Sequence, residues 1–126
     1  FKEKNYKFKS IIDPTSIISN NSNIKKGVYI GPGVIINNNA TINENSIINT
    51  GSIVEHDTKI GSNSHIAPGA KILGSVSIGK NCFIGSGTIV NNNLIITKNC
   101  SVGSGSVVVK NIKIKGTYVG IPAKKL

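Results

Sequence analysis

A histidine stands directly before an aspartate at His56-Asp57, in a chain of 126 residues with only two histidines and five acidic residues. Imidazole titrates near neutral pH, so His56 is suited to take a proton from an amine or a hydroxyl group. A carboxylate on the far ring nitrogen would hold the tautomer and stabilise the imidazolium. Asp57 can make that contact where the chain turns, whereas Glu55 would point to the opposite face of a strand. We predict that His56 is a general base oriented by Asp57; a structural histidine on an exposed corner is the alternative.

A period of six residues runs through the chain and must position this pair. Every sixth residue from Ile12 to Ile114 is Ile or Val, and no insertion interrupts the series. Neither the ~3.6-residue period of an α-helix nor the alternation of a simple strand gives this spacing, and sustained self-similarity is typical of a solenoid. The series predicts one structural unit repeated along residues 12–114.

The remaining places in each hexad predict its shape. Four residues after the Ile or Val stands a small or medium residue, as at Ala40 and Thr58, which gives a second inward place. Three residues after it stands almost always Gly, Asn or Asp, as at Gly33, Asn45 and Asp57. These residues tolerate the left-handed backbone angles of a turn. Each hexad is therefore expected to form one short strand and one corner.

Three such units close a triangular coil of eighteen residues, and successive coils stack at the ~4.8 Å spacing of neighbouring strands. We predict an all-β parallel β-helix of five to six coils. Parallel crossovers are nearly always right-handed, and the period by itself does not set the hand. His56 should point outward at a corner, with Gly74 one coil along. A glycine leaves its N–H open to a ligand there, or else marks a tight bend.

Composition limits the classes of partner. Fifteen lysines, no arginine and five acids give a formal charge of +10. A basic surface fits an anionic partner, but lysines that stand singly, without interleaved aromatics, argue against nucleic acid; solvated lysines are the alternative.

The sequence has no apolar run near ~20 residues and no signal-peptide pattern, so we expect a soluble cytoplasmic protein that does not enter membranes. Cys82 and Cys100, eighteen residues apart at the small inward place, are expected as core thiols rather than a disulfide.

Four segments carry a resemblance to a known family. The pattern Ile-Gly-x-x-small-x at residues 30–34, 60–64, 78–82 and 84–88 resembles the hexapeptide-repeat acyltransferases, whose fold is a left-handed parallel β-helix. Residues 54–90, with GTYVGIPAKKL at the end, are similar to the subgroup of sialic acid O-acetyltransferases and UDP-4-amino-sugar N-acetyltransferases. In that subgroup a small α/β domain that binds the nucleotide sugar precedes the β-helix. The resemblance implies a linker at 1–11, the acyltransferase domain at 12–117 and a C-terminal cap at 118–126, in a chain that lacks the first domain.

The resemblance also implies a site. By this resemblance we expect acetyl-CoA as the cosubstrate, without a metal, bound between the subunits of a homotrimer. His56 is the base, Asp57 matches the acidic residue that follows it, and the Gly74 N–H binds the oxyanion of the thioester carbonyl. The expected contacts of the cofactor are His65, Ser86, Ser104, Gly120, Pro122 and Lys124. A surface role for His65 and solvation of the terminal lysines are the alternatives.

The expected function is acetyl transfer from acetyl-CoA to an amino group of a nucleotide sugar in bacterial glycan biosynthesis, directly and with His56 as base. O-acetylation of a sugar or of sialic acid is one alternative. A noncatalytic β-helix for binding is another, and the asparagine triplets at 37–39 and 91–93, on one corner, favour it. A carbonic anhydrase on this helix would need three histidine ligands, and the chain has two.

Overall fold

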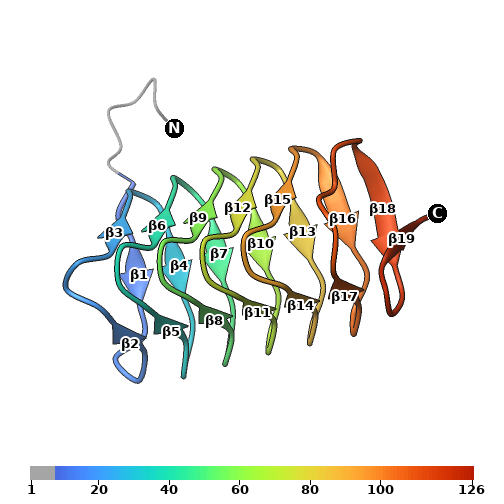
Figure 1. Ribbon diagram of the computed structural model, residues 1–126. Coiled ribbons are helices and arrows are strands. Elements are labelled where there is room, and N and C mark those ends of the chain that lie inside the picture. Colours follow the sequence, from blue (N-terminus) through green and yellow to red (C-terminus); the bar gives the residue numbers. More distant parts are fainter. Residues whose placement is uncertain (1–7) are drawn as a thin grey trace.

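The computed structural model describes residues 8–126, which form short strands and turns wound into one continuous coil (Figure 1). The strands lie on three faces. Face A contains β1 (Ile11–Ile12), β4 (Tyr29–Ile30), β7 (Ile47–Ile48), β10 (His65–Ile66), β13 (Phe83–Ile84), β16 (Cys100–Val102), β18 (Gly116–Val119) and β19 (Lys124–Lys125). Face B contains β2 (Ile17–Ile18), β5 (Ile35–Ile36), β8 (Ile53–Val54), β11 (Lys71–Ile72), β14 (Ile89–Val90) and β17 (Val107–Val108). Face C contains β3 (Asn23–Ile24), β6 (Thr41–Ile42), β9 (Lys59–Ile60), β12 (Ser77–Ile78) and β15 (Ile95–Ile96).

Neighbouring strands on each face are parallel and eighteen residues apart. On face B, Ile36 pairs with Val54, which pairs with Ile72 in the next coil. Because face B holds six strands, residues 8–126 make six coils. The prediction of an all-β parallel β-helix of hexapeptide repeats is confirmed, and the stacked coils are consistent with the left-handed helix that the resemblance implies. Residues 1–7 of the expected linker lie outside the described residues.

The core is a narrow column inside the coils. β-branched side chains suit this space, because each strand presents only one residue inward and must pack against the coils above and below. The second inward place carries small groups, including six buried serines and threonines, and no buried side-chain nitrogen or oxygen in residues 8–126 lacks a hydrogen-bond partner. The isoleucines of this column with the largest buried side chains are Ile30, Ile36, Ile42, Ile48, Ile60, Ile66, Ile72, Ile78, Ile84 and Ile96.

The corners have the backbone that the sequence predicts. Asn39, Asn45 and Asp57 have φ values of 59°, 59° and 60°, in the left-handed region that Asn, Asp and Gly tolerate. Ser75 adopts the same conformation with φ at 58°, although serine is less suited to it. We name the three corners by the faces they join: corner A–B, corner B–C and corner C–A.

The last coil departs from the six-residue series that the sequence predicts. Ile114, expected to point inward, is 63% exposed, and Ile112, at 4% exposure, bridges Ile96 instead. Val102 likewise pairs with Tyr118, sixteen residues later. The chain crosses the last B–C corner with two residues fewer, so the period ends at Val108 and an aromatic residue takes the place above Val102.

The C-terminal residues close this end of the helix. Strand β19 turns back and pairs antiparallel with β18, with Tyr118 opposite Lys125 (Figure 1). At the opposite end, in the first described coil, Ile12 is 46% exposed. Residues 8–126 contain no helix with the length and hydropathy that crossing a membrane requires.

Candidate active site

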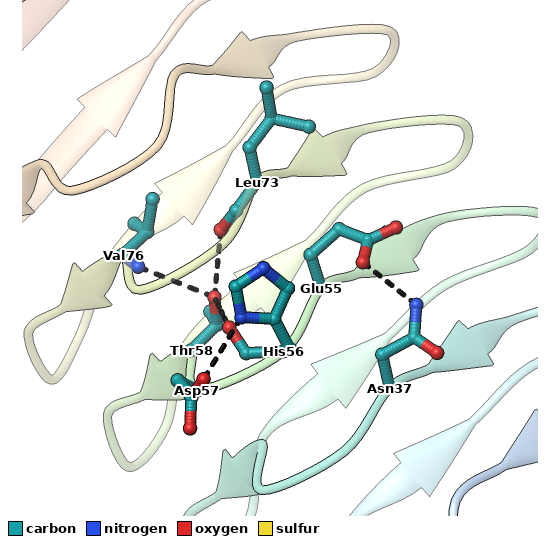
Figure 2. A network of polar contacts seen from close by, with 7 residues as sticks. All are labelled: Asn37, Glu55, His56, Asp57, Thr58, Leu73 and Val76. Carbon is teal, nitrogen blue, oxygen red and sulfur yellow. Dashed lines mark hydrogen bonds and ion pairs between the residues drawn. The ribbon is translucent and has the colours of Figure 1, made fainter.

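His56 lies at corner B–C, in the turn between β8 and β9. Its ring points away from the core, and the side chains of His56 and Asp57 are 59% and 54% exposed. The His56 Nδ1 atom is 2.9 Å from Oδ2 of Asp57 (Figure 2). The carboxylate accepts a hydrogen bond from Nδ1–H, and this tautomer leaves the lone pair of Nε2 free. A histidine in this state can receive a proton from a substrate.

Gly74 lies against the free side of this ring, one coil along the same corner. A methyl group on Gly74 would lie 2.5 Å from Nε2 and 2.6 Å from Cε1 of His56. The stack is held by the backbone, since the Ser75 N–H donates to the His56 carbonyl oxygen at 2.9 Å. Among residues 8–126 the Gly74 N–H has no hydrogen-bond acceptor. The site thus combines a proton acceptor with an unused N–H donor, the two groups that acyl transfer requires.

A hollow of about 450 Å³ adjoins His56 on the side of the earlier coils. Its polar wall includes Glu55, whose Oε2 accepts a hydrogen bond from Nδ2 of Asn37 at 2.8 Å (Figure 2). The sequence predicts only that Glu55 is a poor orienter of the histidine, and it does not predict the place of Glu55 in this hollow. The eighteen-residue spacing from Asn37 to Glu55 is the signal that could have found it. The residues that line the hollow are Ile17, Ile18, Ser19, Ile36, Asn37, Asn38, Glu55 and His56.

His65 lies on a different side of the molecule, on β10 of face A. Its Nε2 is 3.2 Å from Nδ2 of Asn49, and its ring meets Phe83 edge to face at 5.2 Å between centroids. Burial lowers the pKa of His65, which favours the neutral imidazole. Face A is opposite corner B–C in a three-sided coil, so His65 and His56 of one chain do not face a common space.

Ser86 and Ser104 stack above Pro68 at corner A–B, as the sequence predicts. The Gly87 N–H donates to the Pro68 carbonyl oxygen at 3.1 Å, and the Gly105 N–H donates to the Ser86 carbonyl oxygen at 2.8 Å. This corner is separate from the one that carries His56. The predicted catalytic and cofactor residues of a single chain therefore lie in three places.

The predicted contacts near the C-terminus lie at the end of corner A–B. The Gly120 N–H donates to Oγ of Ser106 at 3.1 Å, and the Val107 N–H donates to the Gly120 carbonyl oxygen at 3.0 Å. Pro122 and Lys124 follow in the exposed segment that turns back along β18. Gly120 thus contacts Ser106 at corner A–B, Lys124 pairs with Val119, and all three predicted contacts are distant along the chain from His56.

Cys82 and Cys100 are free, buried thiols, which confirms that they are core residues. The Cys82 thiol donates to the Thr97 carbonyl oxygen at 3.2 Å. Burial raises the pKa of both thiols, so neither has the character of a nucleophile. The chain between residues 8 and 126 brings together no group of three or more His, Cys, Asp or Glu side chains placed to hold a metal ion.

Two stretches of the chain, residues 39–74 and 75–110, match the family model described as bacterial transferase hexapeptide (six repeats). They cover more than half of the sequence. The chain belongs to this family. The matched stretches of this hexapeptide transferase include His56, His65 and Gly74, and they confirm the family that the Ile-Gly-x-x-small-x segments indicate. Comparison with curated protein sequences gives no significant match.

Solved structures with the same fold include proteins named as sugar acetyltransferases. PerB from Caulobacter crescentus, in complex with CoA and GDP-perosamine, is 32% identical with a TM-score of 0.98, over 99% of this chain and 60% of that chain. A point mutant of perosamine N-acetyltransferase from the same organism, with the same two ligands, is 31% identical with a TM-score of 0.98, over 99% and 60%. The acetyltransferase domain of PglB from Neisseria gonorrhoeae, with acetyl coenzyme A, is 27% identical with a TM-score of 0.95, over 99% and 61%. The chain therefore spans about 60% of the length of these relatives.

Proposed function

We propose that this hexapeptide transferase moves an acetyl group from acetyl-CoA to the amino group of a nucleotide sugar. The observation that carries the proposal is the arrangement at corner B–C, where Asp57 holds Nδ1 of His56 and Nε2 lies against Gly74. The cosubstrate and the acceptor class are supported by the ligands named for the similar structures, CoA with GDP-perosamine and acetyl coenzyme A.

The proposed reaction is a direct transfer. The neutral amine of the sugar attacks the thioester carbonyl carbon and forms the C–N bond, while Nε2 of His56 takes the proton that the amine loses. Negative charge develops on the carbonyl oxygen, and the Gly74 N–H is the donor available to stabilise it. When this intermediate collapses, the C–S bond breaks and the CoA thiolate leaves. The imidazolium returns its proton to the thiolate, so the enzyme ends in its starting state.

The hollow beside His56 is the proposed site of the acceptor sugar. The hollow extends from His56 along the earlier coils, so a sugar bound there could reach past the edge of the histidine ring and place its amine between Nε2 and the carbonyl carbon of a thioester held at Gly74. The Glu55 carboxylate and Asn37 amide can bond to sugar hydroxyls, and the neighbouring isoleucines can pack against the ring of the sugar.

We propose a homotrimer that completes this site. Face A carries an outward column that includes Tyr29, Ile47, His65 and Phe83, and face B carries the partly buried Ile35, Ile53 and Ile89, with the exposed Lys71 between the last two. Face C is mostly polar on its outer surface, as at Lys59. Packing face A of one copy against face B of the next would cover both apolar columns and bring His65 of one chain toward corner B–C of its neighbour.

The remaining assignments follow from this arrangement. Acetyl-CoA would lie between two copies, with corner A–B and the C-terminal segment as proposed contacts of the pantetheine arm and phosphates. The domain division proposed from the sequence is a linker at 1–11, the catalytic β-helix at 12–117 and the cap at 118–126, after a sugar-binding domain in the whole protein. Acetyl-CoA and nucleotide sugars, the proposed substrates, are metabolites of the cytoplasm, so we propose the cytoplasm as the location of this protein.

The function is tested by CoA release from acetyl-CoA, with GDP-perosamine and other nucleotide-linked amino sugars as acceptors. The variant His56→Ala should lower kcat by about 10²- to 10⁴-fold and leave the melting temperature unchanged. A near-normal rate for His56→Ala would remove this residue as the base. Turnover only with hydroxyl acceptors would indicate O-acetylation, and no turnover by the full-length protein with any acceptor would indicate a binding module.

The shared site is tested by mixing subunits. His56→Ala and His65→Ala are each expected to be weakly active as homotrimers. In a mixed population at equal amounts, about one quarter of the sites would combine an intact His56 with an intact His65 from the neighbouring copy, and activity should recover to that level. No recovery after verified mixing would mean that the two histidines do not act in one intersubunit site.

A further inference from the structure

The buried hydroxyl of Thr58 joins the two ends of the turn that contains Gly74. Its Oγ1 donates to the Leu73 carbonyl oxygen at 2.8 Å and accepts a hydrogen bond from the Val76 N–H at 3.3 Å (Figure 2). Thr58 has no exposed surface. It therefore cannot touch a substrate, but it contacts the backbone on both sides of Gly74.

This contact sets the direction of the Gly74 N–H. In a trans peptide the carbonyl oxygen and the following N–H point in opposite directions. Since the Leu73 carbonyl is held toward Thr58 in the interior, the Gly74 N–H of the same peptide points away from the core. Ser75, at φ 58°, has the left-handed conformation of the third residue of a type II turn, which agrees with this orientation.

Other turns at corner B–C do without such a bridge. In the turn at residues 37–40 the Ala40 N–H donates directly to the Asn37 carbonyl oxygen at 3.3 Å, whereas the ends of the turns at 55–58 and 91–94 share neither this bond nor a side-chain bridge. In the two coils after Thr58 the same place holds Val76 and Leu94, which have no hydroxyl. Among the four successive coils that contain Ala40, Thr58, Val76 and Leu94, only the turn that contains Gly74 has its two ends joined by a side chain from the preceding coil.

We propose that Thr58 is a positioning residue that holds the Gly74 N–H toward the developing oxyanion. The proposal rests on the proposed acetyl transfer and assigns Thr58 no contact with either substrate. Without the hydroxyl, the Leu73 carbonyl and the Val76 N–H can pair directly, as at Ala40, and the peptide that carries the Gly74 N–H would shift. An N–H that is misplaced by a fraction of an ångström binds the oxyanion less well than it binds in its proper place.

The test compares Thr58→Val with a matched control, Ser64→Ala. Ser64 makes the same bridge at corner C–A, donating to the Gly79 carbonyl oxygen at 2.9 Å and accepting from the Cys82 N–H at 3.1 Å. Both substitutions remove one buried bridge, and Val76 shows that valine fits the inward place at corner B–C. We expect similar losses of melting temperature in the two variants.

The activities should differ. Thr58→Val should lower kcat about ten- to a hundredfold with little change in the KM for acetyl-CoA, and Thr58→Ser should restore most of the rate. Ser64→Ala should keep kcat near that of the unaltered protein. Equal kcat values for Thr58→Val and Ser64→Ala, or a loss confined to KM, would overturn the proposal.

Crystal structures of the two variants give a second readout that needs no acceptor. In Thr58→Val the Leu73–Gly74 peptide should rotate and the Val76 N–H should bond directly to the Leu73 carbonyl oxygen, while Ser64→Ala leaves this turn unchanged. An unmoved peptide in Thr58→Val would refute the role of Thr58 even if the protein proved to have another activity. Absence of turnover in the unaltered full-length protein would instead refute the proposed function and leave these structures to decide the role of Thr58.

Discussion

Replacing Gly74 by alanine should separate activity from stability. The φ angle of Gly74 is outside the left-handed region, so the backbone accepts an alanine without strain. The new methyl group would lie 2.5 Å from Nε2 and 2.6 Å from Cε1 of His56. Because these atoms are the far end of an exposed side chain, the ring can turn aside instead of forcing the coils apart.

The size of the effect follows from the contact distance. Ordinary contact between such atoms begins near ~3.5 Å, so the ring must move by about 1 Å. A displacement of that size at a reacting group can lower the rate by about a hundredfold. Stability should stay the same or rise by up to about 1 kcal/mol, because alanine reduces the conformational freedom of the unfolded chain at a position whose native backbone suits it.

The assay is CoA release at saturating substrates, together with thermal unfolding of the same samples. A matched control is Gly31→Ala at corner A–B, where a methyl group would lie 3.1 Å from the backbone nitrogen of Thr50. That variant should lose stability but keep kcat below its melting temperature. Full activity of Gly74→Ala would refute the argument that the position of the ring over Gly74 matters for catalysis.

Three further predictions concern other groups. Asp57→Asn should lower kcat by at least about tenfold, because an amide can donate to Nδ1 and so favour the tautomer that protonates Nε2; kinetics across a pH range measure it. Burial lowers the pKa of His65 below its unfolded value near ~6.5, so its contribution to stability is complete above that pH and falls as the pH drops through this range. Unfolding in denaturant at several pH values should therefore show a weaker loss on acidification in His65→Gln than in the unaltered protein. The raised pKa and burial of Cys82 and Cys100 predict that neither reacts with a thiol reagent such as DTNB until the protein unfolds, and two fast-reacting thiols in the native protein would contradict this.

The fold was predictable because each hexad has nearly the same surroundings as the next. A strand that contacts only the coils above and below needs the same inward residue each time, and each corner needs a residue that accepts a left-handed backbone, as Asp57 does. The outward position of His56 was predictable for the same reason, since its hexad keeps the inward residues of the repeat and differs only at its outward places. The pairing of Nδ1 with Asp57 then required only that adjacent residues meet at a turn.

The last coil was not predictable from the period. Ile112 and Ile114 are two residues apart, so both would point to the same face of an extended strand, and either could be the residue that enters the core. Which of the two enters the core depends on the length of the corner before it. The strands of the earlier coils pair eighteen residues apart, so they give no precedent for this shorter corner. Glu55 was missed for a related reason, because its partner Asn37 is close only after the coils stack.

The three-sided coil also limits how this chain can change in length. An insertion of six residues before Val54 would keep every later Ile and Val inside, and Gly74 would still follow His56 by one coil. It would nevertheless turn the base by one third of a revolution, from corner B–C to corner C–A, while the earlier residues of the hollow stayed behind. Only an insertion or deletion of eighteen residues restores the corner. Among homologues that keep this site, differences in chain length ahead of the histidine should therefore be multiples of eighteen residues, even though the core itself would accept an insertion of six.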